Sequence, residues 1–282
     1  MLEFGQVSGR ARLHDADASV PLVVAVHGGT YDSAYFDVPG FSLLDRADTQ
    51  NLPVIAIDRP GYGDTPLLAK SAMTLRGQGR FLVGALGDIW RLHGQGRAGL
   101  FVIGHSIGAA IALFAASDPA DLPLLGIAVS GVGMRTPPEH KAMWDAFPDQ
   151  DLVGLPDEVK DGVMFGPEGS YEPEAPAAAR MANRTVPRVE IVDIVSSWAG
   201  DAGAVLCEIR VPVHYRQGEF DRLWIVDERE VHAFEAALSH SPAVDAAMVT
   251  GMGHCLDFHR VGAGFQLGQL GFALTAATIA GR

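Results

Sequence analysis

The sequence predicts an α/β protein with a mostly parallel sheet flanked by helices, and two observations support this prediction. Short apolar runs rich in β-branched residues are bounded by Pro or Gly, as buried strands of a parallel sheet are. Stretches with helical patterning separate these runs, which is typical of βαβ units. The 282 residues are 48% hydrophobic and 20% charged, so the chain can bury one substantial core.

Six apolar runs are predicted strands, and most of the segments between them are predicted helices. The strands cover residues 21–27, 53–58, 100–104, 124–130, 211–216 and 244–250. The helices cover residues 75–93, 106–117 and 226–238, and a last helix begins at Val261. In a parallel sheet with helices on both faces, functional groups collect in the loops at the carboxyl ends of the strands. We therefore expect the functional residues in those loops.

Between residues 135 and 204 the regular pattern stops. Many prolines lie there among acidic and small residues, but aromatic residues such as Trp144 and Trp198 can anchor the segment to the rest of the protein. We expect a lid of short helices, inserted into a core made of residues 1–134 and 205–282.

Composition argues against several classes of function. The chain has 34 Asp and Glu against 21 Lys and Arg, and a net charge of -13 would repel nucleic acids. No Cys/His grouping has the spacing of a zinc site, so no metal is expected, and Cys207 and Cys255 cannot form a disulfide framework. The N-terminus lacks the apolar segment of a signal peptide, which favours a cytoplasmic protein.

The uncharged stretch 261–281 is long enough to span a bilayer, but its composition argues against that role. Gln266 and Gln269 would lie in lipid, and four glycines dilute the hydrophobicity of the stretch. We expect a terminal helix packed on the sheet and no membrane contact. No feature of the sequence predicts an oligomeric state.

The motif Gly104-His105-Ser106-Ile107-Gly108 lies between a predicted strand and a predicted helix. A G-x-S-x-G sequence in this context is typical of a nucleophile elbow, because the glycines let the backbone turn sharply and expose the serine hydroxyl. Ser106 is the predicted nucleophile.

A serine hydroxyl needs a base to accept its proton, and histidine fills that role most often. Of the ten histidines, His254 lies in a glycine-rich loop directly after the last predicted strand. His259 is the closest alternative, but it lies where the terminal helix begins. His105 precedes the nucleophile on the same turn, where sequence neighbours point apart. We therefore predict that His254 is the base.

A base of this kind needs a carboxylate to hold its tautomer and to stabilise the imidazolium. Asp221 follows the penultimate predicted strand directly, and Glu219 and Asp227 are the alternatives. With Asp221 the chain order is Ser, Asp, His.

The loop His27-Gly28-Gly29-Thr30 follows the first predicted strand and can supply backbone amides to an oxyanion. Gly29 is the first choice and Thr30 the second, and Ile107 is the expected donor from the elbow. Five further residues are candidates for substrate binding: Gly28, Arg59 and Tyr62 from the core, and Trp144 and Trp198 from the lid. Arg59 and Tyr62 lie in a turn that is as readily explained as scaffold.

Taken in order, these motifs resemble those of the α/β-hydrolase superfamily, in its lidded branch of esterases, lactonases and C–C bond hydrolases. The resemblance rests on His27-Gly28-Gly29-Thr30, on the loop 58–63, on Ser106, on Gly218-Glu219-Phe220-Asp221 and on Gly253-His254. It spans nearly the whole chain, except that the lid resembles nothing familiar. It implies an α/β-hydrolase fold with an eight-stranded, mostly parallel sheet, flanking helices and an inserted helical lid.

The leading expectation is a hydrolase that cleaves an ester, lactone or thioester of a mostly apolar small molecule through an acyl-enzyme. C–C bond hydrolysis, lyase or acyltransferase chemistry with the same three residues is the alternative, because fold does not fix reaction. A non-catalytic receptor is less favoured, since the set of Ser, His and Asp is complete. No cofactor is expected, because backbone amides and an imidazolium supply the charge stabilisation.

Overall fold

The computed structural model describes residues 2–146 and 150–280, and its centre is an eight-stranded mixed sheet. The strands lie in the order β1 (Leu2–Phe4), β2 (Val7–Arg12), β4 (Val54–Ile57), β3 (Leu22–Val26), β5 (Leu100–His105), β6 (Leu124–Ser130), β9 (Val213–Gly218) and β10 (Val244–Val249). All neighbours from β4 to β10 pair in parallel, whereas β1 with β2 and β2 with β4 pair antiparallel. The prediction of a mostly parallel, eight-stranded sheet is confirmed.

The six predicted strands correspond to β3, β4, β5, β6, β9 and β10, whereas the hairpin β1–β2 was not predicted. This hairpin lies at the edge of the sheet, where β2 carries Arg10 and Arg12 with only partial burial. An antiparallel edge strand needs one buried face only, so its sequence lacks the continuous apolar run of a central parallel strand.

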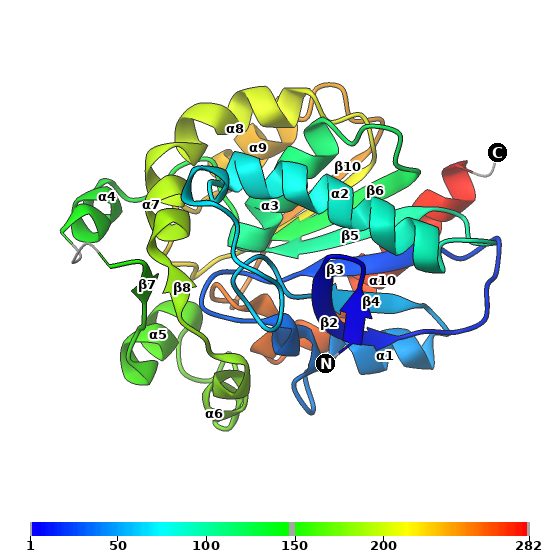
Figure 1. The fold of residues 1–282 in the computed structure, drawn as a ribbon. Helices are drawn as coiled ribbons and strands as arrows, with labels where there is room; N and C mark the ends of the chain where they lie inside the picture. Colours follow the sequence, from blue (N-terminus) through cyan, green and yellow to red (C-terminus); the bar gives the residue numbers. More distant parts are fainter. Residues whose placement is uncertain (1, 147–149, 281–282) are drawn as a thin grey trace.

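Helices cover both faces of the sheet (Figure 1). On one face lie α2 (Leu75–His93), α3 (Ile107–Ser117), α8 (Trp198–Cys207) and α9 (Glu228–Ala237), and on the other lie α1 (Leu43–Thr49) and α10 (Gly262–Ala280). Helix α2 begins where the Thr74 hydroxyl accepts a hydrogen bond from the amide of Gly77. Helix α3 is apolar all round because it is buried between the sheet, α2 and α8.

The terminal helix α10 packs on the sheet at β6 through small side chains such as Ala273 and Ala276, which are fully or nearly fully buried. Gly281, the last residue of the predicted stretch, lies outside the described residues. Over residues 2–146 and 150–280, none of the helices combines the length and the apolar character that a bilayer crossing requires.

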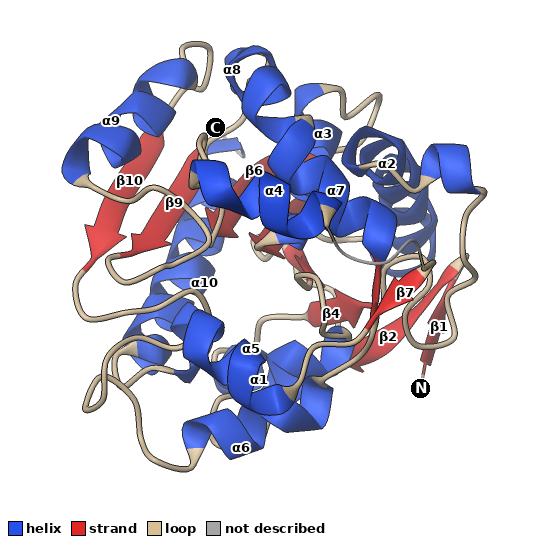
Figure 2. Cartoon of the chain, turned by 90° about the vertical axis from the view of Figure 1, so that its left-hand side faces the viewer, coloured by secondary structure: helices blue, strands red, loops and turns tan. Residues whose placement is uncertain are grey.

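The segment between β6 and α8 stands in front of the carboxyl ends of the strands (Figure 2). It consists of α4 (Pro138–Asp145), β7 (Leu152–Val153), α5 (Asp157–Met164), α6 (Ala175–Ala179), β8 (Val186–Pro187) and α7 (Arg188–Ser196). Helix α4 contacts α7, which also contacts α2 and α8, while α6 contacts the segments Arg180–Ala182 and Leu256–Phe258. Four short 3-10 helices complete the described elements: Ser33–Asp37, Lys70–Ala72, Arg180–Ala182 and Leu256–Phe258.

The predicted lid boundary at residue 204 falls inside α8, which packs against α3 and α9. Trp198 at the start of this helix is fully buried, and its indole N–H donates to the carbonyl of Gly133 at 2.7 Å. We therefore propose that the lid ends before α8 and that α8 belongs to the core.

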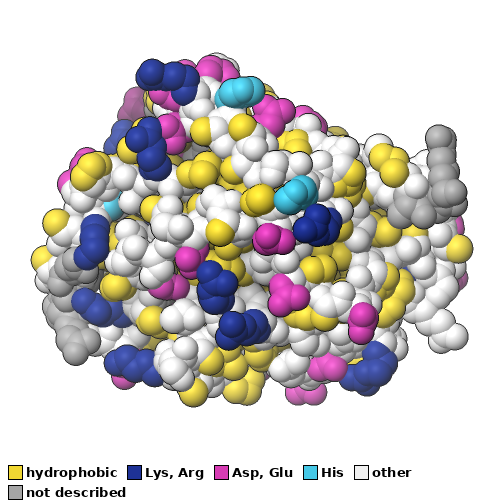
Figure 3. All heavy atoms as spheres, turned by 90° about the horizontal axis from the view of Figure 1, so that it is seen from above, with side chains coloured by type: hydrophobic (Ala, Val, Ile, Leu, Met, Phe, Trp, Pro, Cys, Tyr) yellow, Lys and Arg dark blue, Asp and Glu magenta, His cyan; other side chains and the backbone are white. Residues whose placement is uncertain are grey.

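The face above α2 and α8 carries acidic and basic side chains interspersed with hydrophobic ones (Figure 3).

Candidate active site

Ser106 lies on a sharp turn between β5 and α3. Its φ of 56° and ψ of -124° are in the left-handed half of backbone space, where a residue with a side chain is strained. The amide of Ser106 donates to the carbonyl of Ser130 on β6 at 2.8 Å, which fixes the turn to the sheet. A side chain at Gly108 would come within 2.3 Å of the His27 carbonyl, so only glycine lets the helix approach β3 this closely.

His254 and Asp221 form a hydrogen-bonded chain that ends at Ser106. Nε2 of His254 lies 2.8 Å from Oγ of Ser106, and its Nδ1 lies 2.7 Å from Oδ2 of Asp221. The side chains of His254 and Asp221 are almost completely buried. With the proton on Nδ1, His254 donates to the carboxylate and is free to accept the proton of Ser106.

Two further donors hold the Asp221 carboxylate in place. Its Oδ2 also accepts from Nε2 of Gln217 at 2.8 Å, and its Oδ1 accepts from the amide of Leu223 at 2.9 Å. A buried carboxylate that accepts several hydrogen bonds is fixed in position, and it fixes the imidazole ring in turn.

The alternative residues occupy other positions. Nε2 of His259 accepts from the amides of Gly253 at 2.9 Å and Gly166 at 3.0 Å, so its lone pair is not available to Ser106. The ring of His105 stacks on Tyr35 at a centroid distance of 4.8 Å. The two carboxylates take part in local structure, because Glu219 accepts from the amide of Gly251 and Asp227 caps α9.

The loop 27–30 lies against the nucleophile. A side chain at Gly28 would come within 2.8 Å of Cβ of Ser106, and one at Gly29 within 2.8 Å of Cδ1 of Ile107. Among the described residues, the amides of Gly29 and Ile107 donate no hydrogen bond. Two adjacent free N–H groups beside a serine hydroxyl are the arrangement that stabilises an oxyanion.

Thr30 adds a second unusual feature to this loop. It has a φ of 64°, which is rare for a β-branched residue, and its side chain is buried. Its hydroxyl has no hydrogen-bond partner within the described part of the chain, although it lies in the wall of the cavity beside Ser106. An unpaired buried hydroxyl is costly, so Thr30 has the properties of a group that awaits a ligand.

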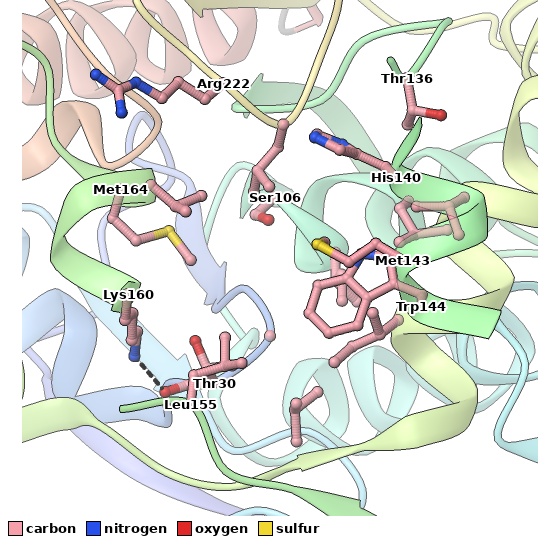
Figure 4. Close-up of a pocket in the computed structure, with 18 of the residues that line it drawn as sticks. Thr30, Ser106, Thr136, His140, Met143, Trp144, Leu155, Lys160, Met164 and Arg222 are labelled. Carbon is pink, nitrogen blue, oxygen red and sulfur yellow. Dashed lines mark hydrogen bonds between the residues drawn. The ribbon is translucent and has the colours of Figure 1, made fainter. Parts of the chain in front are cut away.

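A cavity of about 370 Å³ opens over Ser106 (Figure 4). Its wall is mostly apolar: Ser106 lies between Met164 of α5 on one side and Met143 and Trp144 of α4 on the other. Ile191, Ile194 and Val195 of α7 also line it. The polar side chains in the wall other than Ser106 are Thr30, Thr136, His140, Lys160 and Arg222.

The structure places four of the predicted substrate-binding residues outside this wall, and one inside it. Trp144 lines the cavity, whereas Gly28, Arg59, Tyr62 and Trp198 do not. Arg59 and Tyr62 are buried and both donate to the carboxylate of Glu190, and Trp198 is buried against Phe114 of α3. Of the five, Trp144 is the one in the cavity wall, and a substrate-binding role stays a prediction for each.

Sequence reasoning missed Lys160 and Glu190, two charged lid residues that are almost completely buried. Nζ of Lys160 donates to the carbonyl of Thr30 at 2.7 Å and lies 3.3 Å from the centre of the Tyr31 ring. Burial lowers the pKa of the Lys160 ammonium from its ordinary 10.5 to about 7. In the sequence both lie among other charged residues of the lid, which by itself indicates a solvated position.

Over the described ranges, no group of three or more His, Cys, Asp or Glu side chains is arranged to hold a metal ion.

Comparison with known proteins gives one family. Residues 23–262 match the model of the Alpha/beta hydrolase family. A comparison with curated proteins finds no match.

Solved structures share the fold over nearly their whole length. A thermophilic esterase from Thermogutta terrifontis is 16% identical with a TM-score of 0.69, over 96% of this chain and 94% of that one. A monoacylglycerol lipase from Paleococcus ferrophilus is 15% identical with a TM-score of 0.66, over 96% and 99%. A 2-hydroxy-6-oxo-6-phenylhexa-2,4-dienoate hydrolase from Rhodococcus sp. strain RHA1 is 20% identical with a TM-score of 0.64, over 95% of both. At these identities the likeness shows the α/β-hydrolase fold alone.

Proposed function

Because the chain belongs to the alpha/beta hydrolase family, we propose that it is a serine hydrolase that cleaves an ester, lactone or thioester of a mostly apolar small molecule. The observation that supports this proposal is the hydrogen-bonded chain from Asp221 through His254 to Ser106, placed beside the free amides of Gly29 and Ile107.

In the first half of the proposed reaction, Oγ of Ser106 attacks the carbonyl carbon while Nε2 of His254 takes its proton. The carbonyl oxygen becomes an oxyanion, and the amides of Gly29 and Ile107 donate to it. His254 then gives the proton to the leaving oxygen or sulfur, so an acyl-enzyme forms and the alcohol or thiol departs.

In the second half, a water molecule gives its proton to His254 and attacks the acyl carbon. The same two amides bind the second oxyanion, and His254 returns the proton to Oγ of Ser106 as the acid leaves. Asp221 keeps its charge throughout and stabilises the imidazolium of each half-reaction. The apolar wall of the cavity favours a hydrocarbon-rich acyl or alcohol group.

A fluorophosphonate tests the proposal, because it reacts only with an activated serine. We expect stoichiometric labelling of Ser106 at neutral pH and a burst of product from a p-nitrophenyl ester. Replacement of His254 by Ala should abolish both, whereas Ser117→Ala, at the far end of the same helix, should change neither. An unlabelled protein that still hydrolyses the ester would refute the assignment of Ser106.

C–C bond hydrolysis is the second candidate, since a neighbour in structure is named as a hydrolase of an oxo-dienoate. Such a substrate carries a carboxylate, and two cationic side chains of the cavity wall already donate to carbonyls: Lys160 to Thr30 and Arg222 to Gly162. Each of these cations keeps N–H donors that could bind a carboxylate, so it is the mostly apolar wall of the cavity that favours the ester reaction. A larger kcat/KM on a vinylogous 1,5-diketone acid than on matched esters would reverse the preference.

A further inference from the structure

Arg59 is a core residue with only 1% of its surface exposed. Its guanidinium binds the loop 27–30 directly. Its Nε donates to the carbonyl of His27 at 2.9 Å and its Nη2 donates to the carbonyl of Gly28 at 3.1 Å. The amide of Arg59 donates to Nε2 of His27 at 3.1 Å. Two successive carbonyls of the loop are therefore held by one rigid, planar group.

The direction of these carbonyls decides the direction of the amides that follow them. In a trans peptide the C=O and the N–H point to opposite sides. When Arg59 holds the carbonyl of Gly28, the N–H of Gly29 in the same peptide points away from the guanidinium. Gly29 lines the cavity and Arg59 does not, so the side away from Arg59 is the side of Ser106.

The lid holds the guanidinium in this position. Glu190 of α7 is fully buried, and its two carboxylate oxygens accept from Nη1 and Nη2 of Arg59 at 2.8 and 3.0 Å. Oη of Tyr62 and Nε2 of Gln78 donate to the same carboxylate at 3.0 and 2.8 Å. A bidentate pair of this kind fixes both distance and plane.

A second lid contact holds the other end of the loop. The carbonyl of Thr30 accepts from Nζ of Lys160 on α5 at 2.7 Å, as Figure 4 shows, and from the amide of Arg184 at 2.9 Å. Thr30 is the residue with the rare φ of 64°, so these bonds hold the strained end of the loop.

We propose that Arg59 is a positioning residue for the oxyanion hole and that the lid, through Glu190, keeps it in place. The inference rests on the proposed function, because it concerns the amide of Gly29 at that site. Helix α7 then has two roles. Its residues Ile191, Ile194 and Val195 line the cavity, and Glu190 binds the guanidinium of Arg59, which orients the amide of Gly29. Any displacement of α7 disturbs substrate contact and oxyanion stabilisation together.

Glu190→Gln is the central variant, because it keeps the shape of the side chain and removes the charge that fixes Arg59. The matched control is Asp193→Asn on the same helix, whose carboxylate accepts from the amide of Leu75 and has no link to the oxyanion loop. Loss of one oxyanion donor lowers kcat by about 10² to 10³. A misdirected amide in Glu190→Gln is therefore expected to lower kcat about tenfold or more with little change in KM, while Asp193→Asn keeps both.

A pair of substrates separates a positioning role from a structural one. In a thionoester, sulfur replaces the carbonyl oxygen and accepts hydrogen bonds from N–H groups more weakly. The proposal predicts that Glu190→Gln slows the ester much more than the matching thionoester, so that the ratio of their kcat values falls. A loosened protein would instead slow both substrates alike and raise KM.

Arg59→Lys provides a second variant, because it keeps the charge but lacks the fork that binds two carbonyls. If neither variant folds, Tyr62→Phe removes one hydroxyl from Glu190 and should show the same fall in the ratio on a smaller scale. If a folded variant among these three shows the wild-type ratio of kcat values for ester and thionoester, the proposal is overturned. A wild-type protein without esterase activity would contradict the proposed function instead, so the two failures are distinguishable.

Discussion

The two walls of the cavity are held by different kinds of contact. On the core side, Ser106, Gly29 and Ile107 lie at strand ends and on a helix start whose backbone is fixed by the sheet. On the lid side, Trp144, Met164 and Val195 present apolar side chains from short helices. We propose that the core wall carries the chemistry, while the lid wall contacts the substrate and, through Glu190, supports the oxyanion loop.

The largest effect is expected when the predicted nucleophile is removed from the core wall. Ser106→Ala should lower kcat by about 10⁶ for an ester substrate, because the acyl-enzyme can no longer form. Because the apolar lid wall is unchanged, the Kd for a non-cleavable ester analogue should stay within about twofold of the wild-type value. Residual activity near that of wild type, measured on protein free of contaminating esterase, would refute the role of Ser106.

The core wall could be predicted from the sequence because its signals are local. The motif around Ser106, the glycines at 28 and 29 and the loop at His254 each lie directly after an apolar run, and the structure places all of them at one edge of the sheet. The order of these motifs along the chain is enough to bring them together, since parallel strands end on the same side.

The lid wall could not be predicted in the same way, because its decisive contacts join residues far apart in sequence. Arg59 and Glu190 are 131 residues apart, and neither is identifiable as buried from its neighbours. Glu190 lies in a segment that mixes charged and apolar residues, as a half-exposed helix does. The proposed shift of the boundary from residue 204 has a related reason, since in sequence α8 continues the lid whereas in the structure it contacts α3 and α9.

The junction between the two walls offers the second test. His259 joins the lid residue Gly166 to Gly253 by accepting from both amides, and its Nδ1 lies 2.9 Å from the carbonyl of Cys255. His259→Leu leaves the buried amide of Gly253 and the half-buried amide of Gly166 without an acceptor, and an unpaired buried amide costs about 2 kcal/mol. We expect the free energy of unfolding, measured with urea, to fall by about 3 kcal/mol.

His259→Gln is the matched variant for this junction, because its amide oxygen can accept from both N–H groups at a similar reach. It should keep most of the stability and the fluorophosphonate labelling of Ser106. If His259→Gln instead lost labelling while it stayed folded, His259 would have a direct part in the reaction, and the assignment of His254 alone as base would be wrong.

The pH dependence of stability offers a third test, which concerns His214 in the core. Burial lowers the pKa of His214 to about 4, and Asp245 and Arg216 are its charged neighbours. Between pH 6.5 and 4 the unfolded chain binds a proton at this position and the folded chain does not. The free energy of unfolding therefore falls as the pH falls through this window, by about 3 kcal/mol in total.

His214→Leu should remove this part of the pH dependence, since a leucine binds no proton in either state. Urea unfolding at several pH values between 7 and 4 measures the difference between the two proteins. His214 packs on Phe272 of α10 rather than at the cavity, so ester hydrolysis at pH 7 should be unchanged. Parallel pH curves for wild type and variant would show that His214 titrates normally.

The smallest expected effect belongs to the lid wall itself. Val195 of α7 lines the cavity, whereas Val192 on the same helix does not. Val195→Phe fills part of the space, and a pocket discriminates substrates that differ by one or two methylenes by about tenfold. We expect kcat/KM for long acyl esters to fall about tenfold relative to short ones, with Val192→Phe as the control that leaves the ratio unchanged. Equal losses for long and short esters in Val195→Phe would show that α7 acts on the oxyanion loop alone, because a change in that loop slows every ester alike.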